Sequence, residues 1–139
     1  MGAPLAGYLY FDENLHGGHY FVVGPDDPWD ADNVLVFCCT SQPHHRPPEA
    51  GCFEDLRYHS FHLPAGTVSR LTKPTWVLMG ECYPYKKADF SGRWRVPREK
   101  LSLSLTVELL LCASRSKTLA LTDSQRCAEE ATAIQQAMT

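Results

Sequence analysis

Short apolar runs separated by polar, glycine-rich or proline-rich segments dominate the first two-thirds of the chain. Such runs, rich in valine, tyrosine and phenylalanine and bounded by Gly, Pro and Asp, are typical of β-strands. They predict strands at YLYF (8–11), HYFVVG (19–24), NVLVFCC (33–39), YHSFHL (58–63), TWVLMG (75–80) and CYPYKK (82–87). Pro84 restricts the last of these to an edge strand, because proline cannot donate to a sheet ladder.

The pattern changes after Gly92. Arg95–Glu99 resembles a helix start, with Pro97 at the first helical position. Apolar residues then recur at helical spacing at Leu101, Leu105, Leu109 and Cys112. The same stretch also alternates with a period of two, so a strand is a competing prediction. The continuous apolar run LLLCAS does not alternate and therefore favours the helix.

A second helix is predicted at the C-terminus. Thr122–Gln125 fits a capping box, in which the two end residues satisfy free backbone donors. An apolar stripe follows at Cys127, Ala131, Ile134 and Met138. The 139 residues therefore predict a single domain that is mainly β with C-terminal helices, in which a barrel-like sheet (1–92) is packed against a helical part (93–139).

Composition adds information on compartment and partners. No apolar run approaches the roughly 20 residues needed to span a bilayer, and the acidic N-terminus lacks a basic export signal, so a cytoplasmic protein without a membrane partner is expected. Net charge is only −3, but residues 1–32 hold six acids and no Lys or Arg, whereas residues 86–100 hold six bases. This asymmetry indicates an anionic partner for the basic segment, or self-association.

The six cysteines are scattered among apolar neighbours, which favours reduced and mostly buried thiols. Cys38 and Cys39 are adjacent on one predicted strand, so they point to opposite faces and cannot share a site. Neither the Cys-Cys pair nor His59 and His62 has the spacing of a common zinc motif, so no metal or other cofactor is predicted. A metal site assembled from distant parts of the chain stays open as an alternative.

Histidines and hydroxyls supply the candidate chemistry. Histidine titrates near neutral pH and suits acid–base catalysis when it lies in a cleft. Thr40 and Ser41 follow a buried strand directly, where hydroxyls either make a local turn or hold a phosphate. Aromatic and basic residues alternate around 83–95, a combination used to stack and bind single-stranded RNA, although these aromatics also suit a core.

The order of HYFVV, PDDPWDADN, NVLVFCCTS, HSFHLP and LTKPTWVL resembles the PemK/MazF-like proteins over roughly residues 16–90. The resemblance implies a small SH3-like barrel of the PemK/MazF/CcdB type with appended helices. It also implies the activity of bacterial type II toxins, which are metal-independent endoribonucleases that cleave single-stranded RNA, usually as homodimers, and are neutralised by an antitoxin. By position, the strand-end hydroxyl of that family corresponds to Thr40, with Ser41 beside it, while His19 stands where the family has an arginine.

The candidate site residues fall into a catalytic and a substrate-binding group. The predicted catalytic residues are His19, Thr40 and Ser41, with His19 as acid or base. The predicted substrate-binding residues are Arg46, His45, Lys86, Lys87, Arg93 and Trp94. Two other readings stay open: a non-catalytic nucleic-acid- or protein-binding module on the same barrel, and a thiol or zinc protein.

Overall fold

The computed structural model describes residues 6–12, 19–90, 97 and 99–139. Its elements in chain order are β1 (Tyr8–Asp12), β2 (His19–Asp27), β3 (Asp30–Thr40), β4 (Gly51–Phe53), β5 (Ser60–Leu63), β6 (Thr75–Leu78), β7 (Tyr83–Lys86), the 3₁₀ helix η1 (Lys87–Phe90), β8 (Glu99–Lys100), α1 (Leu103–Ser114) and α2 (Leu121–Ala137). All six predicted strands form, although their ends differ by a few residues.

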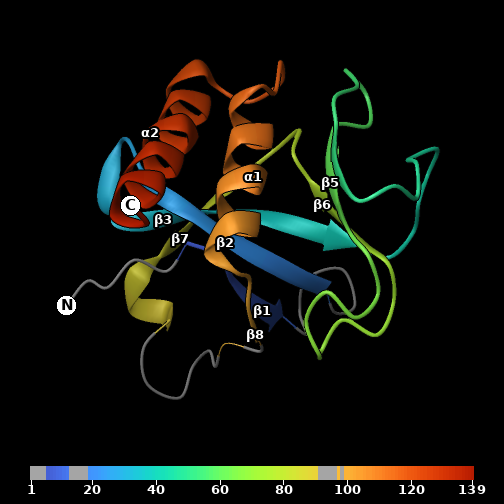
Figure 1. Ribbon diagram of the computed structural model, residues 1–139. Helices are drawn as coiled ribbons and strands as arrows, with labels where there is room; N and C mark the ends of the chain where they lie inside the picture. Colours follow the sequence, from blue (N-terminus) through green and yellow to red (C-terminus); the bar gives the residue numbers. More distant parts are fainter. Residues whose placement is uncertain (1–5, 13–18, 91–96, 98) are drawn as a thin grey trace.

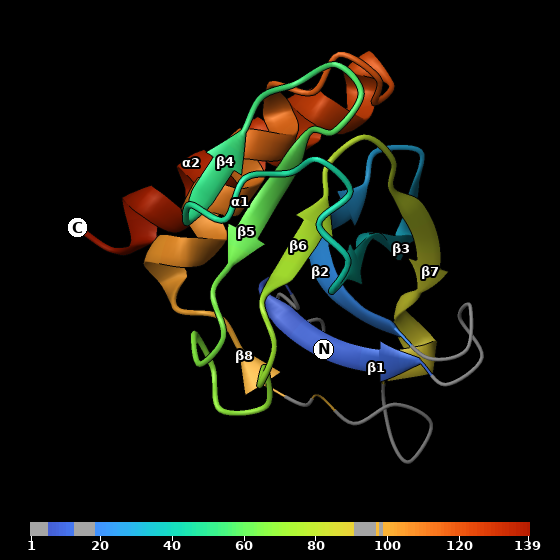
Figure 2. The same ribbon diagram turned by 90° about the vertical axis from the view of Figure 1, so that its right-hand side faces the viewer.

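The strands make one antiparallel sheet in the order β4-β5-β6-β3-β2-β1-β8, with β7 as an additional partner of β3. The long strand β3 is central. One of its edges pairs with β2, and the other pairs first with β7 at Asn33–Val36 and then with β6 at Cys39 and Thr40. The sheet curls into a half-barrel, with the two helices side by side on one of its faces (Figures 1 and 2).

Both faces of the central strands are buried, which explains why their sequences are continuously apolar. Leu9, Val22 and Phe37 join the core under the helices, which includes Leu110 and Cys127. Their alternating neighbours form a smaller aromatic cluster on the other face, made of Tyr10, Phe21, Val23, Val34, Val36 and Phe90, with Tyr85 packed against it. The aromatics Tyr85 and Phe90 of the basic segment therefore contribute to a core.

Both predicted C-terminal helices form, but the first begins later than the sequence predicts. Glu99 and Lys100 form β8, which pairs with β1, so the sheet extends into the part expected to be helical. Helix α1 begins at Leu103, where the Ser102 hydroxyl accepts a hydrogen bond from the backbone N–H of Leu105 (3.1 Å). Most of the expected start at 95–99 lies outside the described residues. The competing strand over 101–112 is excluded.

The C-terminal helix α2 is confirmed, but its predicted cap is wrong. Ala120 precedes the helix as its N-cap and makes no side-chain cap hydrogen bond, so Thr122 already lies in the first turn. Of the predicted stripe, Cys127 and Ala131 are buried, whereas Met138 is exposed beyond the helix end. In the described part of the chain, neither helix has the length and apolarity that crossing a membrane requires.

Candidate functional site

A cavity of about 280 Å³ lies where β2 begins and β3 ends, and is called here the strand-end pocket. It is lined by Phe11, His19, Tyr20, Cys39, Thr40, Ser41, Arg70, Leu71, Thr72, Lys73 and Thr75. Because β2 and β3 are antiparallel and Phe21 pairs with Cys38, extending the same register by two residues sets His19 opposite Thr40. All three predicted catalytic residues therefore line one pocket.

The His19 ring is oriented by the neighbouring strand. Its Nδ1 lies 2.8 Å from the backbone oxygen of Cys39. Because a carbonyl only accepts hydrogen bonds, Nδ1 carries the proton, and the lone pair of the neutral ring is on Nε2. This tautomer suits a base that takes up a proton at Nε2.

The two hydroxyls differ in their surroundings. Thr40 Oγ1 accepts a hydrogen bond from the backbone N–H of Gln42 at 3.1 Å, which holds the turn that follows β3. Its hydroxyl hydrogen can still be donated to an anion, since a hydroxyl is both donor and acceptor. Ser41 is exposed at the mouth of the same pocket. Thr40 thus has the local turn role and a position suited to binding.

Two cations that the sequence analysis did not select complete the pocket. Arg70 and Lys73 belong to the segment between β5 and β6, and both are exposed. This segment is anchored by the buried Leu71 and by a hydrogen bond from the Tyr20 hydroxyl to the Arg70 carbonyl (3.5 Å). Among the described residues, neither cation forms an ion pair. In the sequence, these two cations are visible only as the basic residues of RLTKPT, just before a predicted strand. Nothing in that stretch indicates that it folds over the end of β3.

Arg46 lines a second concavity of about 340 Å³, which shares His19 and Thr40 with the strand-end pocket. The Arg46 guanidinium lies over the Tyr58 ring, 5.5 Å from its centroid, and Nη1 donates to the Pro43 carbonyl (3.2 Å). Its buried Nε has no hydrogen-bond partner among the described residues. Thus His19, Thr40 and Arg46 do converge on one concavity.

His45 lies outside both cavities. Its ring packs against Tyr58, with the centroids 5.4 Å apart. His44, which does line the second concavity, and His45 both have positive φ, of 44° and 70°. Non-glycine residues rarely adopt this backbone region, so the loop that carries His44 and Arg46 has an unusual backbone conformation.

The other predicted substrate-binding residues lie elsewhere or outside the described chain. Lys86 pairs with Asn33, seven residues before Thr40 along β3, which corresponds to about 23 Å of strand. Lys87 forms an ion pair with Asp26 (3.0 Å). Lys86 and Lys87 line neither cavity. Arg93 and Trp94 lie outside the described residues.

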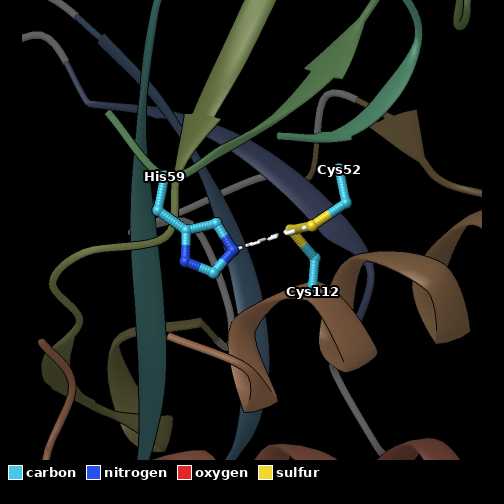
Figure 3. A group of neighbouring side chains, drawn as sticks. All are labelled: Cys52, His59 and Cys112. Carbon is cyan, nitrogen blue, oxygen red and sulfur yellow. Dashed lines mark hydrogen bonds between the residues drawn. A yellow bond between two sulfur atoms is a disulfide. The ribbon is translucent and has the colours of Figure 1, made fainter. Parts of the chain in front are cut away.

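A second cluster of reactive side chains lies between β4, β5 and α1. Cys52 on β4 and Cys112 on α1 form a disulfide, and His59, just before β5, faces both sulfurs (Figure 3). The expectation that all the cysteines are reduced is therefore wrong for this pair. Strand β4 was not predicted, and it is the element that brings residue 52 next to a helix 60 positions later.

The adjacent cysteines of β3 are arranged as strand parity predicts. Cys39 is buried, whereas Cys38 on the opposite face is partly exposed. Burial raises the pKa of the Cys38 thiol and raises that of Cys39 far above its ordinary range. Neither thiol suits nucleophilic catalysis, because the thiolate is the reactive form.

Comparisons with protein families, with curated proteins and with solved structures found no match to this chain. The assignment of function therefore depends on the geometry of the site.

Proposed function

We propose that the strand-end pocket binds a backbone phosphate of single-stranded RNA and that the protein is a metal-independent endoribonuclease of the PemK/MazF-like kind on an SH3-like barrel. One observation carries the proposal: His19, Thr40 and Ser41 surround the same cavity as the cations Arg70 and Lys73. A base, hydroxyl donors and positive charge are the groups that phosphodiester cleavage by an internal hydroxyl requires.

In the proposed reaction, the ribose 2′-oxygen attacks the adjacent phosphorus. His19 accepts the 2′-hydroxyl proton at Nε2, the bond from phosphorus to the 5′-oxygen breaks, and that oxygen takes up a proton from water, while His19 later returns its proton to solvent. The products are a 2′,3′-cyclic phosphate and a free 5′-hydroxyl. Arg70 and Lys73 stabilise the extra charge on the phosphate oxygens, the role that an arginine at position 19 fills in the family that the chain resembles.

A non-catalytic binding module is the second candidate. The hydrogen bond that Thr40 already receives from Gln42 favours it, because a hydroxyl that holds a turn is less available to a substrate. The same cations would then bind nucleic acid or an acidic protein segment without cleaving it.

Cleavage of an unstructured RNA oligonucleotide in the presence of a chelator tests the proposal. We expect cleavage of RNA but not of a matched oligonucleotide with 2′-deoxyribose at the cleaved position, because the nucleophile is then missing. His19→Ala and Arg70→Ala should abolish or strongly reduce cleavage, whereas Lys86→Ala should not. RNA binding without cleavage supports the binding module. Cleavage that is unchanged in both His19→Ala and Thr40→Ala contradicts the catalytic assignment.

The homodimer and the antitoxin partner belong to the same proposal. Light scattering of the purified protein measures whether it is a dimer. Co-purification with a small acidic protein encoded by an adjacent gene tests for the antitoxin.

A further inference from the structure

We propose that Cys52, His59 and Cys112 form a zinc site when the two cysteines are reduced, and that the disulfide closes this site when they are oxidised. The potential ligand atoms of the three residues lie within 4.8 Å of one another. Two cysteines and a histidine are ligands that zinc favours. The site is separate from the strand-end pocket and does not depend on the proposed RNA cleavage.

The His59 ring is positioned so that its Nε2 and the two sulfurs could bind the same metal ion. Its Nε2 lies 3.6 Å from Cys52 Sγ and 3.3 Å from Cys112 Sγ. Zinc bonds of about 2.3 Å to sulfur and about 2.0 Å to nitrogen, at a tetrahedral angle, put a nitrogen and a sulfur ligand about 3.5 Å apart. The imidazole therefore already stands at the ligand-to-ligand spacing of such a site, with Nε2 directed at the sulfurs (Figure 3).

Disulfide and metal exclude each other. Two sulfur ligands of one tetrahedral zinc are about 3.8 Å apart, a separation that the S–S bond does not allow. A thiol reductant supplies two electrons and two protons, which convert the disulfide into two thiols, while the reductant becomes a disulfide itself. Zinc then binds both sulfurs as thiolates and releases the two protons to solvent.

Packing and a neighbouring ion pair position the three ligands in addition to the disulfide. Cys112 is fully buried and His59 is 7% exposed, so both are fixed by packing, while the more exposed Cys52 provides access for the metal. Next to them, the carboxylate of Glu54 accepts a hydrogen bond from Arg115 Nε (2.7 Å), which ties the end of β4 to the end of α1. Three protein ligands leave the fourth tetrahedral position to water.

The test is metal binding by the wild-type protein in its two redox states. We expect one Zn²⁺ per chain after reduction with a thiol and removal of the excess reductant, and none in the oxidised protein, as measured by competition with a metallochromic indicator. Co²⁺ in place of Zn²⁺ should give an intense thiolate-to-cobalt charge-transfer band only in the reduced protein. Affinity should rise with pH, since binding releases protons.

Two variants separate this site from general thiol binding. Cys52→Ser removes the most exposed ligand and should weaken zinc affinity at least about 100-fold, since loss of even an outer partner costs about 10–100-fold. Cys38→Ser removes a partly exposed thiol outside the cluster and should leave one zinc bound. Circular dichroism establishes that each variant is folded.

A folded reduced wild-type protein that binds no zinc overturns the proposal, and the cluster is then a disulfide with a neighbouring imidazole. Equal zinc binding by reduced Cys52→Ser and wild type also overturns it. Both results leave the RNA-cleavage proposal unaffected, because that reaction is measured in the presence of a chelator.

Discussion

His19 and His59 both stand at the start of a strand beside a cysteine-containing segment, yet their surroundings are opposite. His19 hydrogen-bonds to the Cys39 backbone and lines a polar cavity with Arg70 and Lys73. His59 is buried, and its Nε2 faces two sulfurs. The element that covers each ring makes the difference: a basic loop lies near the first, and helix α1 covers the second. Residue type alone therefore did not decide which histidine suits proton transfer and which suits a metal.

The largest effect should come from removing the disulfide of the His59 region. Cys52→Ala/Cys112→Ala should lower the free energy of unfolding by about 4 kcal/mol, because the cross-link closes a loop of 60 residues and restricts the unfolded chain. Urea unfolding without reductant measures the change. His19→Ala is the matched control at the other site and should cost only about 1 kcal/mol, because it removes the hydrogen bond to the Cys39 backbone oxygen. Equal stability of the wild type with and without reductant would contradict the assignment.

The cations of the His19 region should have the next largest effect. Arg70→Ala/Lys73→Ala should weaken binding of single-stranded RNA about tenfold or more and reduce the salt-dependence slope by about 1.4, since each phosphate contact on a single strand contributes about 0.7. Fluorescence anisotropy at several salt concentrations measures both quantities. Lys86→Ala/Lys117→Ala makes the same charge change at two exposed lysines outside the strand-end pocket. An equal loss in both double variants would mean that general charge, and not the pocket, binds RNA.

A smaller effect distinguishes the two roles of Thr40. Thr40→Val removes the acceptor for the Gln42 N–H and should cost about 1 kcal/mol of stability, while Thr40→Ser retains it. If Thr40 also donates to phosphate, RNA affinity falls in Thr40→Val as well. Urea unfolding and anisotropy on the same samples separate the roles. If Thr40→Val loses stability but keeps its RNA affinity, Thr40 stabilises the turn and does not bind phosphate.

The smallest expected effect is the pH dependence of stability in the His59 region. Burial is the main cause that lowers the pKa of His59, and it also lowers that of His62, so the unfolded chain binds more protons than the folded one. Their contribution to stability is complete above the unfolded pKa of about 6.5 and is lost as pH falls from there toward the folded values. Urea midpoints between pH 7.5 and 5 should decrease in the wild type and decrease less in His59→Gln/His62→Gln. If the urea midpoint depends on pH equally in both proteins, His59 and His62 are not the cause of the pH dependence.

The strands were largely predictable because they depend on local sequence. Apolar runs predicted the six strands. His19 and Thr40 were candidates from the sequence, but only the register of β2 and β3 shows that they lie opposite each other. The parity argument also separated Cys38 from Cys39 correctly. These inferences need only the period of a strand and the order of neighbouring strands.

The remaining features depend on long-range packing that no local pattern encodes. Gly51–Phe53 is too short to give a periodic signal, so neither β4 nor the pairing of Cys52 with Cys112 was expected. Arg70 and Lys73 reach the pocket only because their loop folds back beside Tyr20, 50 residues earlier. Lys86 shows the opposite: its basic segment was predicted to bind the substrate, but it lies at the other end of β3 from the strand-end pocket.

Along one edge, β3 changes partner from β7 to β6, so β4–β6 pairs with the rest of the sheet at one end of β3. In the described part of the chain, only two ladder pairs, Cys39 with Val77 and Thr40 with Trp76, join β4–β6 to β3. Because this junction is short, we expect β4–β6 to exchange its amide hydrogens as a block, at a lower free energy than the β1–β3 block, even though β5 is buried along its whole length. The loop with Arg70 and Lys73 and the ligands Cys52 and His59 all belong to the weaker block, while His19 and Thr40 belong to the stronger one. Local opening of β4–β6 would thus disassemble both sites in a single event, and reduction of the one disulfide that ties this block to α1 would make that opening more frequent.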